Sequence, residues 1–193
     1  MLNFNKQVIM NNKVCGPATD FTLVKEEDTR TVISYDLQEE AGKELATWRE
    51  IYFPKKQTAK PTLQQVKDAI IADIDKQTDE KILNGYQFTP DGAEEPITVW
   101  LSKENQTNFS AAHRLQIVPI KFKLNETADK QPIYHEFTTF EDLDAFYKGG
   151  VQYINQCLNE GWARKDGIDW APYEQALNPQ PANETKGGKK SKM

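Results

Sequence analysis

Residues 62–85 repeat an apolar or small residue at every fourth position. Side chains four residues apart share one face of an α-helix, so this spacing predicts a long helix with a single buried stripe. Thr62 and Gln65 predict a capping box at its start. Asn84 and Gly85 predict its end, with Gly85 in the left-handed position after the last turn. The stripe consists of Val66, Ile70, Ile74, Thr78 and Ile82.

The residues before this helix favour β structure. Alternating apolar and polar residues predict four strands, at Phe4–Met10, Phe21–Val24, Thr31–Leu37 and Trp48–Phe53. Residues 41–45 are ambiguous and are compatible with one helical turn. Pro54–Pro61 is rich in Lys and Pro, and proline cannot donate a hydrogen bond to a central sheet ladder. The sequence therefore predicts a β-rich N-terminal docking region over 1–55 and a linker over 56–61.

A hairpin and a second helix are predicted after Gly85. Tyr86–Thr89 and Ile97–Leu101 form the arms of the hairpin, and Pro90-Asp91-Gly92 between them is typical of a turn. Ser102 caps a helix that runs to about Leu115. Its inward residues are predicted to be Phe109, Ala112 and Leu115.

A second hairpin and a third helix complete the predicted module. Ile117–Leu124 alternates apolar and basic residues and is paired with Pro132–Thr138. Thr139 and Asp142 start the third helix, and Gly161 is predicted to end it. Gly149-Gly150 inside this helix predicts either a kink or a close packing partner, because each glycine costs about 1 kcal/mol relative to alanine there.

The predicted fold class is therefore α+β, with a β-rich N-terminal region followed by a three-helix, two-hairpin α+β domain. We place this α+β module at 62–177, with its aromatic end, 161–173, folded back over it. Residues 178–193 are almost free of apolar residues and are predicted to form a flexible basic tail. Its lysines favour solubility or tethering, and attraction to an acidic surface or phosphate is the alternative.

Composition excludes several classes of protein. The 24 Lys and Arg against 29 Asp and Glu give a net charge of −5, which argues against a large nucleic-acid footprint. Cys15 and Cys157 do not form a metal-binding spacing and are interpreted as buried or inert thiols. We expect no signal peptide, because the first residues lack an apolar run, and no membrane span, because no segment approaches 18 apolar residues.

Catalytic constellations are not apparent. His113 is predicted on a helix and His135 on a strand, where the adjacent Glu136 points to the opposite face. Carboxylates of Glu141, Asp142 and Asp144 are interpreted as favourable partners of the helix dipole. The polar run Glu104–Asn108 is expected to bond neighbouring backbone, with ligand contact as the alternative. We predict no catalytic, cofactor-binding or metal-binding residues and no enzymatic activity.

Several segments together carry a resemblance to a known family. They are 62–85, including Thr-Asp-Glu-Lys-Ile-Leu-Asn-Gly at 78–85; 98–112, which opens with Thr-Val-Trp-Leu-Ser; Pro-Ile-Lys-Phe-Lys at 119–123; Tyr-His-Glu-Phe-Thr at 134–138; and Gly-Trp-Ala-Arg-Lys-Asp-Gly-Ile-Asp-Trp at 161–170. Their order and spacing are similar to those of virion- and fibre-associated proteins of Bacteroidales-infecting tailed phages, including crAss-like phages and related prophages. The resemblance covers roughly 60–177.

This resemblance implies a structural component of a tailed-phage virion, associated with a head or tail fibre or its adaptor. The expected partners are other phage structural proteins and further copies of this chain in a homo-oligomer, with neither a membrane nor sequence-specific nucleic acid among them. The expected localisation is the virion, after synthesis in the host cytoplasm. Two alternatives are a tail-fibre assembly chaperone and a carbohydrate- or surface-binding module that uses Trp162, Trp170 and Tyr173.

Overall fold

The computed structural model describes residues 11–55 and 60–179 and has the predicted mixed α+β class. The chain divides into two compact units. The first contains the chain up to Ile70 and from Asp169 onward, and the second is Ile71–Ile168. The division therefore falls inside the long helix rather than at 56–61. Residues 56–59 of the predicted linker, the predicted strand Phe4–Met10 and residues 180–193 of the predicted tail lie outside the described residues.

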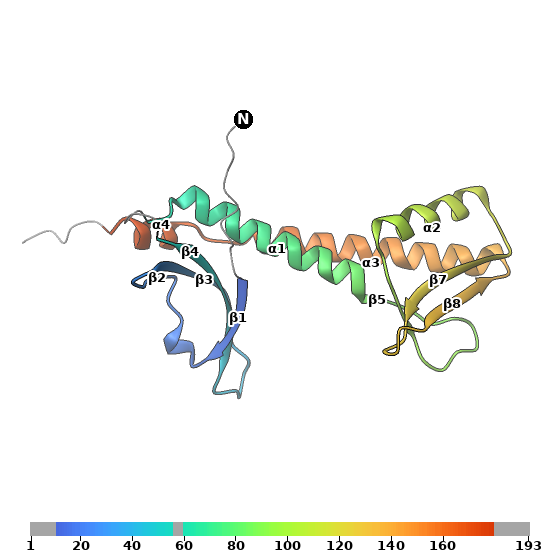
Figure 1. The fold of residues 1–193 in the computed structure, drawn as a ribbon, viewed down its shortest axis with the longest axis horizontal. Helices are drawn as coiled ribbons and strands as arrows, with labels where there is room; N and C mark the ends of the chain where they lie inside the picture. Colours follow the sequence, from blue (N-terminus) through green and yellow to red (C-terminus); the bar gives the residue numbers. More distant parts are fainter. Residues whose placement is uncertain (1–10, 56–59, 180–193) are drawn as a thin grey trace, which may run out of the picture. The chain divides into compact units, whose positions relative to one another are not determined.

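The first unit contains a four-stranded antiparallel sheet (Figure 1). Its strands are β1 (Asn11–Gly16), β2 (Val24–Glu26), β3 (Arg30–Gln38) and β4 (Ala46–Pro54), with the short 3₁₀ helix η1 (Ala18–Asp20) between β1 and β2. They are ordered β1-β4-β3-β2, so β3 and β4 are central. The two central strands confirm the predictions at 31–37 and 48–53.

The predictions around the central strands were less accurate. The strand predicted at Phe21–Val24 begins only at Val24. The possible helical turn at 41–45 is instead a non-helical turn in which Gly42 adopts φ +82°. Glycine has no Cβ to clash in that conformation, so the turn between β3 and β4 uses it.

Strand β3 is covered on both faces. Its residues 31–35 are all buried, including Thr31 and Ser34. Helix α4 (Ala171–Leu177) packs against this sheet, and the buried Tyr173 hydroxyl donates a hydrogen bond to the Ser34 carbonyl at 3.1 Å. The predicted module end at 177 is therefore corrected, because α4 completes the first unit.

Helix α1 (Leu63–Gly85) confirms the apolar stripe and the capping box. The Thr62 N–H donates to Gln65 Oε1 at 2.8 Å, and the Gln65 N–H donates to Thr62 Oγ1 at 3.3 Å. All five stripe residues are at most 9% exposed. Gly85, in contrast, does not adopt the predicted left-handed conformation.

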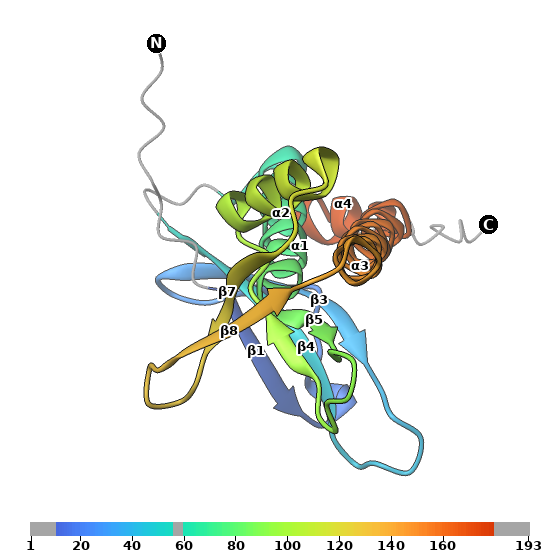
Figure 2. The ribbon, with the colours of Figure 1, turned by 90° about the vertical axis from the view of Figure 1, so that its right-hand side faces the viewer.

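The second unit combines two hairpins with α2 (Lys103–Leu115) and α3 (Phe140–Asp166). The hairpins are β5 (Tyr86–Phe88) with β6 (Ile97–Val99), and β7 (Ile120–Glu126) with β8 (Pro132–Phe137). The Trp100 N–H donates to the Leu124 carbonyl at 2.9 Å and joins the two hairpins. Figures 1 and 2 both show β7 and β8 below α2 and α3. The fully buried Phe137 and Phe146 lie between these layers.

The second unit keeps the predicted three helices and two hairpins, while the additional helix α4 belongs to the first unit. Two predictions about these helices were wrong. Leu115 is 62% exposed rather than buried, since α2 ends at that residue. Gly161 does not stop α3, which continues to Asp166 and is capped by Gly167.

Glycines in this unit serve close packing. A Cβ on Gly149 would lie 2.5 Å from the Tyr86 hydroxyl. Gly149-Gly150 was predicted to mark either a kink or a close packing partner, and Tyr86 is that close partner. On Gly161 a Cβ would lie 2.6 Å from Thr78 Oγ1. On Gly85 it would lie 1.8 Å from the Tyr153 hydroxyl. In each case a polar side chain from another element occupies the space that a methyl group would need.

The adjacent glycines of α3 provide a matched test. We expect Gly149→Ala to destabilise the protein by about 1–2 kcal/mol, because the clash with buried Tyr86 outweighs the gain in helix propensity. Gly150→Ala should be neutral or stabilising, since its Cβ would lie 3.6 Å from the ring. Urea unfolding followed by circular dichroism measures both. Tyr86→Phe should relieve much of the Gly149→Ala penalty in the double variant, and additive effects of the two changes would contradict this explanation.

Candidate functional site

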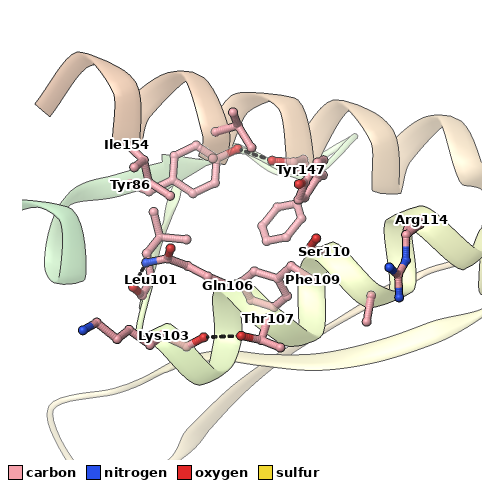
Figure 3. A pocket seen from close by; sticks show the side chains of 14 residues that line it. Tyr86, Leu101, Lys103, Gln106, Thr107, Phe109, Ser110, Arg114, Tyr147 and Ile154 are labelled. Atoms are coloured by element: carbon pink, nitrogen blue, oxygen red, sulfur yellow. Dashed lines mark hydrogen bonds between the residues drawn. The ribbon is translucent and has the colours of Figure 1, made fainter. Parts of the chain in front are cut away.

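A groove lies between α2 and α3 in the second unit (Figure 3). Its volume is about 670 Å³. One wall is α2 and the other is α3, and the buried side chains of Tyr86, Leu101, Phe109 and Phe146 form the base. The two helices run antiparallel here, because Phe109 of α2 packs on Phe146 and the later His113 packs on Phe140.

The wall on α2 is a single helical face. Lys103, Gln106, Ser110 and Arg114 follow one another at steps of three or four residues, with Thr107 and Ala111 beside them. Local hydrogen bonds hold the start of this wall. The Ser102 side chain caps the helix by accepting from the Asn105 N–H at 3.2 Å.

The polar run Glu104–Asn108 bonds neighbouring backbone, as predicted. The Asn105 side chain donates to the Trp100 carbonyl at 2.9 Å, and the Gln106 side chain donates to the Leu101 carbonyl at 2.6 Å. Thr107 donates to the Lys103 carbonyl within α2. Gln106 and Thr107 also line the groove, so their structural bonds fix part of its wall.

The wall on α3 is mostly apolar. Phe146, Gly150 and Ile154 recur at four-residue spacing, and Val151 beside them is 38% exposed. The Tyr86 hydroxyl donates to the Phe146 carbonyl at 2.9 Å. Burial raises the pKa of Tyr86 to about 12, so this hydroxyl stays protonated at neutral pH and remains a donor. The apolar base is therefore held in a fixed position.

Positive charge lies at both ends of the groove. Lys103 and Arg114 line it, and the lining includes no carboxylate. Within residues 11–55 and 60–179, no ion pair is formed by either cation. Helix α3 has no acidic residue between Lys148 and Asn159. The groove is thus locally cationic on a chain whose net charge is −5.

His113 connects α2 to α3 beside the groove. Its Nε2 lies 2.8 Å from Asp144 Oδ1, and its ring stacks on Tyr147 at 4.2 Å between centroids. Lys148 pairs with the other Asp144 oxygen at 2.7 Å. Hydrogen bonds from Lys148 and then from His113 lower the pKa of Asp144. The contact between His113 and Asp144 therefore joins the two walls of the groove.

His135 is placed by aromatic packing. Its ring centroid lies 4.5 Å from that of Phe137 and 5.3 Å from that of Phe88, in edge-on contacts. Burial lowers the pKa of His135, and the weaker attraction of Asp142 opposes that change. The neutral ring is the form that this apolar site favours.

The other residues considered for catalysis or metal binding lie apart from the groove. The Asp142 carboxylate accepts a hydrogen bond from the Thr139 hydroxyl at the start of α3, in keeping with the predicted helix-end role. Cys157 is buried, whereas Cys15 is exposed. The residues that the structure describes contain no cluster of three or more His, Cys, Asp or Glu suited to a metal ion. Over the same ranges, no helix has both the length and the apolar character required to span a bilayer.

The aromatic residues considered for sugar binding serve different roles. Tyr173 is buried, and Trp170 packs beside it with the Lys67 ammonium 5.5 Å from its ring centroid. Both belong to the first unit, whereas Trp162 belongs to the second and is 52% exposed. Packing therefore occupies two of the three rings.

Sequence reasoning did not identify the groove. The sequence did indicate one wall, because the spacing of Lys103, Gln106, Ser110 and Arg114 places them on one face of a predicted helix. That spacing did not show which face of the opposite helix lies nearby. Comparisons with protein-family models, curated proteins and solved structures gave no match.

The environment of His135 predicts a pH dependence. A histidine whose pKa is lowered by folding binds protons more readily when unfolded, so stability should be highest above its ordinary pKa of about 6.5. We expect stability to fall as the pH decreases through that value toward the lower pKa of the folded state. His135→Gln should reduce this slope between about pH 7 and 5 in urea titrations. An unchanged slope would show that other groups cause it.

Proposed function

We propose that this chain is a structural component of a tailed-phage virion, associated with a head or tail fibre or its adaptor, and acts through protein–protein contacts without enzymatic activity. The α2–α3 groove is the observation that carries the contact function. The resemblance of segments 62–85, 98–112, 119–123, 134–138 and 161–170 to virion- and fibre-associated proteins of tailed phages supports the assignment to a virion. Its proposed partners are other phage structural proteins and further copies of itself.

The groove supports protein contact by its composition. Interfaces commonly combine an apolar, aromatic centre with a polar rim. Here Phe109 and Phe146 lie at the base, while Lys103, Gln106 and Arg114 lie toward the edge. Aromatic and arginine side chains are frequent sources of interface energy. The arrangement therefore favours association with another protein.

The environments of His113 and His135 favour a structural role over a catalytic one. General acid–base catalysis requires a titratable side chain aimed at a reacting group in a pocket. His113 instead contacts Asp144, Phe140 and Tyr147 between two helices, and His135 packs on Phe137. Both rings already contribute to packing.

Mass spectrometry of purified particles tests the virion assignment. We expect peptides of this chain in washed particles of a phage that encodes it, at a ratio to the major structural proteins that is constant between preparations. Absence from mature particles would refute the assignment. If fibre trimers then formed only during co-expression with this chain, an assembly chaperone would be the better description.

A groove variant tests the contact surface in the same particles. Val151→Glu places a charge in the apolar wall, and we expect incorporation to fall at least several-fold while the chain remains folded. Leu83→Glu is the matched control, because both side chains are 38% exposed and Leu83 does not line the groove. Equal incorporation of the two folded variants would show that the groove is not used.

A further inference from the structure

We propose that the α2–α3 groove binds the apolar face of an acidic amphipathic helix from a partner protein, with carboxylates of that helix placed at Lys103 and Arg114. This inference rests on the proposed contact function and specifies the chemistry of the partner. It draws on three independent observations, which are the form of the walls, the apolar base and the distribution of charge.

The walls favour a helix over an extended peptide. An extended segment normally binds by pairing its backbone with an exposed strand edge. Here both walls are α-helices, so their backbone N–H and C=O groups are already bonded inside α2 and α3. A peptide in the groove must satisfy its own backbone groups, and an α-helix does so internally.

The apolar base provides matching side-chain positions. Phe109 and Phe146 are at most 3% exposed, whereas Ile154 is partly buried and Val151 is 38% exposed. The groove therefore has a buried apolar centre and, beside it, an apolar wall that is accessible to a ligand. Side chains at i, i+3, i+4 and i+7 of a third helix fit against such a pair of helices.

Charge fixes the chemistry of the flanking residues. Lys103 and Arg114 are separated by eleven positions on α2, which corresponds to about 16 Å along the helix axis. A partner helix of about three turns spans that distance. Because both cations lie at the groove and neither forms an ion pair among the described residues, carboxylates are the complementary groups.

Selection from a displayed peptide library tests this inference with the full chain. The probe is a library of alanine-rich peptides of about 20 residues, long enough to be helical, with one face randomised. The bait is the wild-type chain, and Val151→Glu is used for counter-selection. We expect enrichment of apolar residues at i, i+3, i+4 and i+7, with Asp or Glu about eleven positions apart.

Several results would overturn the inference. They are no enrichment relative to the Val151→Glu bait, enrichment of basic flanks, enrichment of proline-containing extended sequences, or equal competition by a single-stranded oligonucleotide. Each would show that the groove prefers another ligand or none. Circular dichroism of both baits establishes that they are folded before selection.

A charge exchange then tests the role of the two cations. For the most enriched peptide, Lys103→Glu with Arg114→Glu should weaken binding about tenfold or more at low salt, and less at high salt. The double variant Lys76→Glu with Lys121→Glu is the matched control, because it reverses two cations outside the groove lining. A peptide with Lys in place of its acidic residues should regain affinity for the Lys103→Glu/Arg114→Glu protein. Equal loss in both variants would exclude specific pairing.

The outcomes separate this inference from the proposed function. A chain that is present in particles and requires Val151, but selects no acidic helix, would retain its contact role and lose the proposed partner chemistry. A chain that selects acidic helices but is absent from particles would retain the binding mode and lose the virion assignment.

Discussion

The second unit depends on the close approach of bulky polar side chains to glycine backbone. Tyr86 lies over Gly149, and its hydroxyl bonds the Phe146 carbonyl at 2.9 Å. Tyr153 lies over Gly85 in the same way, with its hydroxyl bonded to the Lys81 carbonyl at 2.9 Å. Two tyrosines from different elements therefore bring α1, β5 and α3 to distances that a Cβ would prevent.

The groove is a consequence of this packing. Tyr86 occupies space at the base between α2 and α3. Gly150, which has no side chain, leaves room on the α3 wall at that point. At the other end, His113 contacts Asp144 and Tyr147 and keeps the walls joined. The same contacts that stabilise the helices thus hold a cationic, apolar-based surface in one shape, which reduces the entropy lost on binding.

Local signals in the sequence were reliable where neighbours in the chain make the interaction. The Thr62–Gln65 capping box, the Ser102 cap and the Thr139 cap each involve residues three positions apart, and all three are present. Gly161 was misread because its role depends on Thr78, which is distant in the sequence. Gly85 ends α1 as predicted, but it lacks the left-handed conformation and packs against the distant Tyr153. A helix-ending glycine and a packing glycine look alike until the partner element is known.

The sequence by itself determined the α+β class, the stripe on α1, the hairpins and the polar bonding of Glu104–Asn108, since periodicity and short-range hydrogen bonds define these features. The tertiary structure alone decided that α4 joins the first unit and that α2 and α3 form a groove. It also placed Lys103 and Arg114 at the ends of that groove. These features depend on which faces of separate elements meet, and that choice is made by packing over the whole unit rather than by any local pattern.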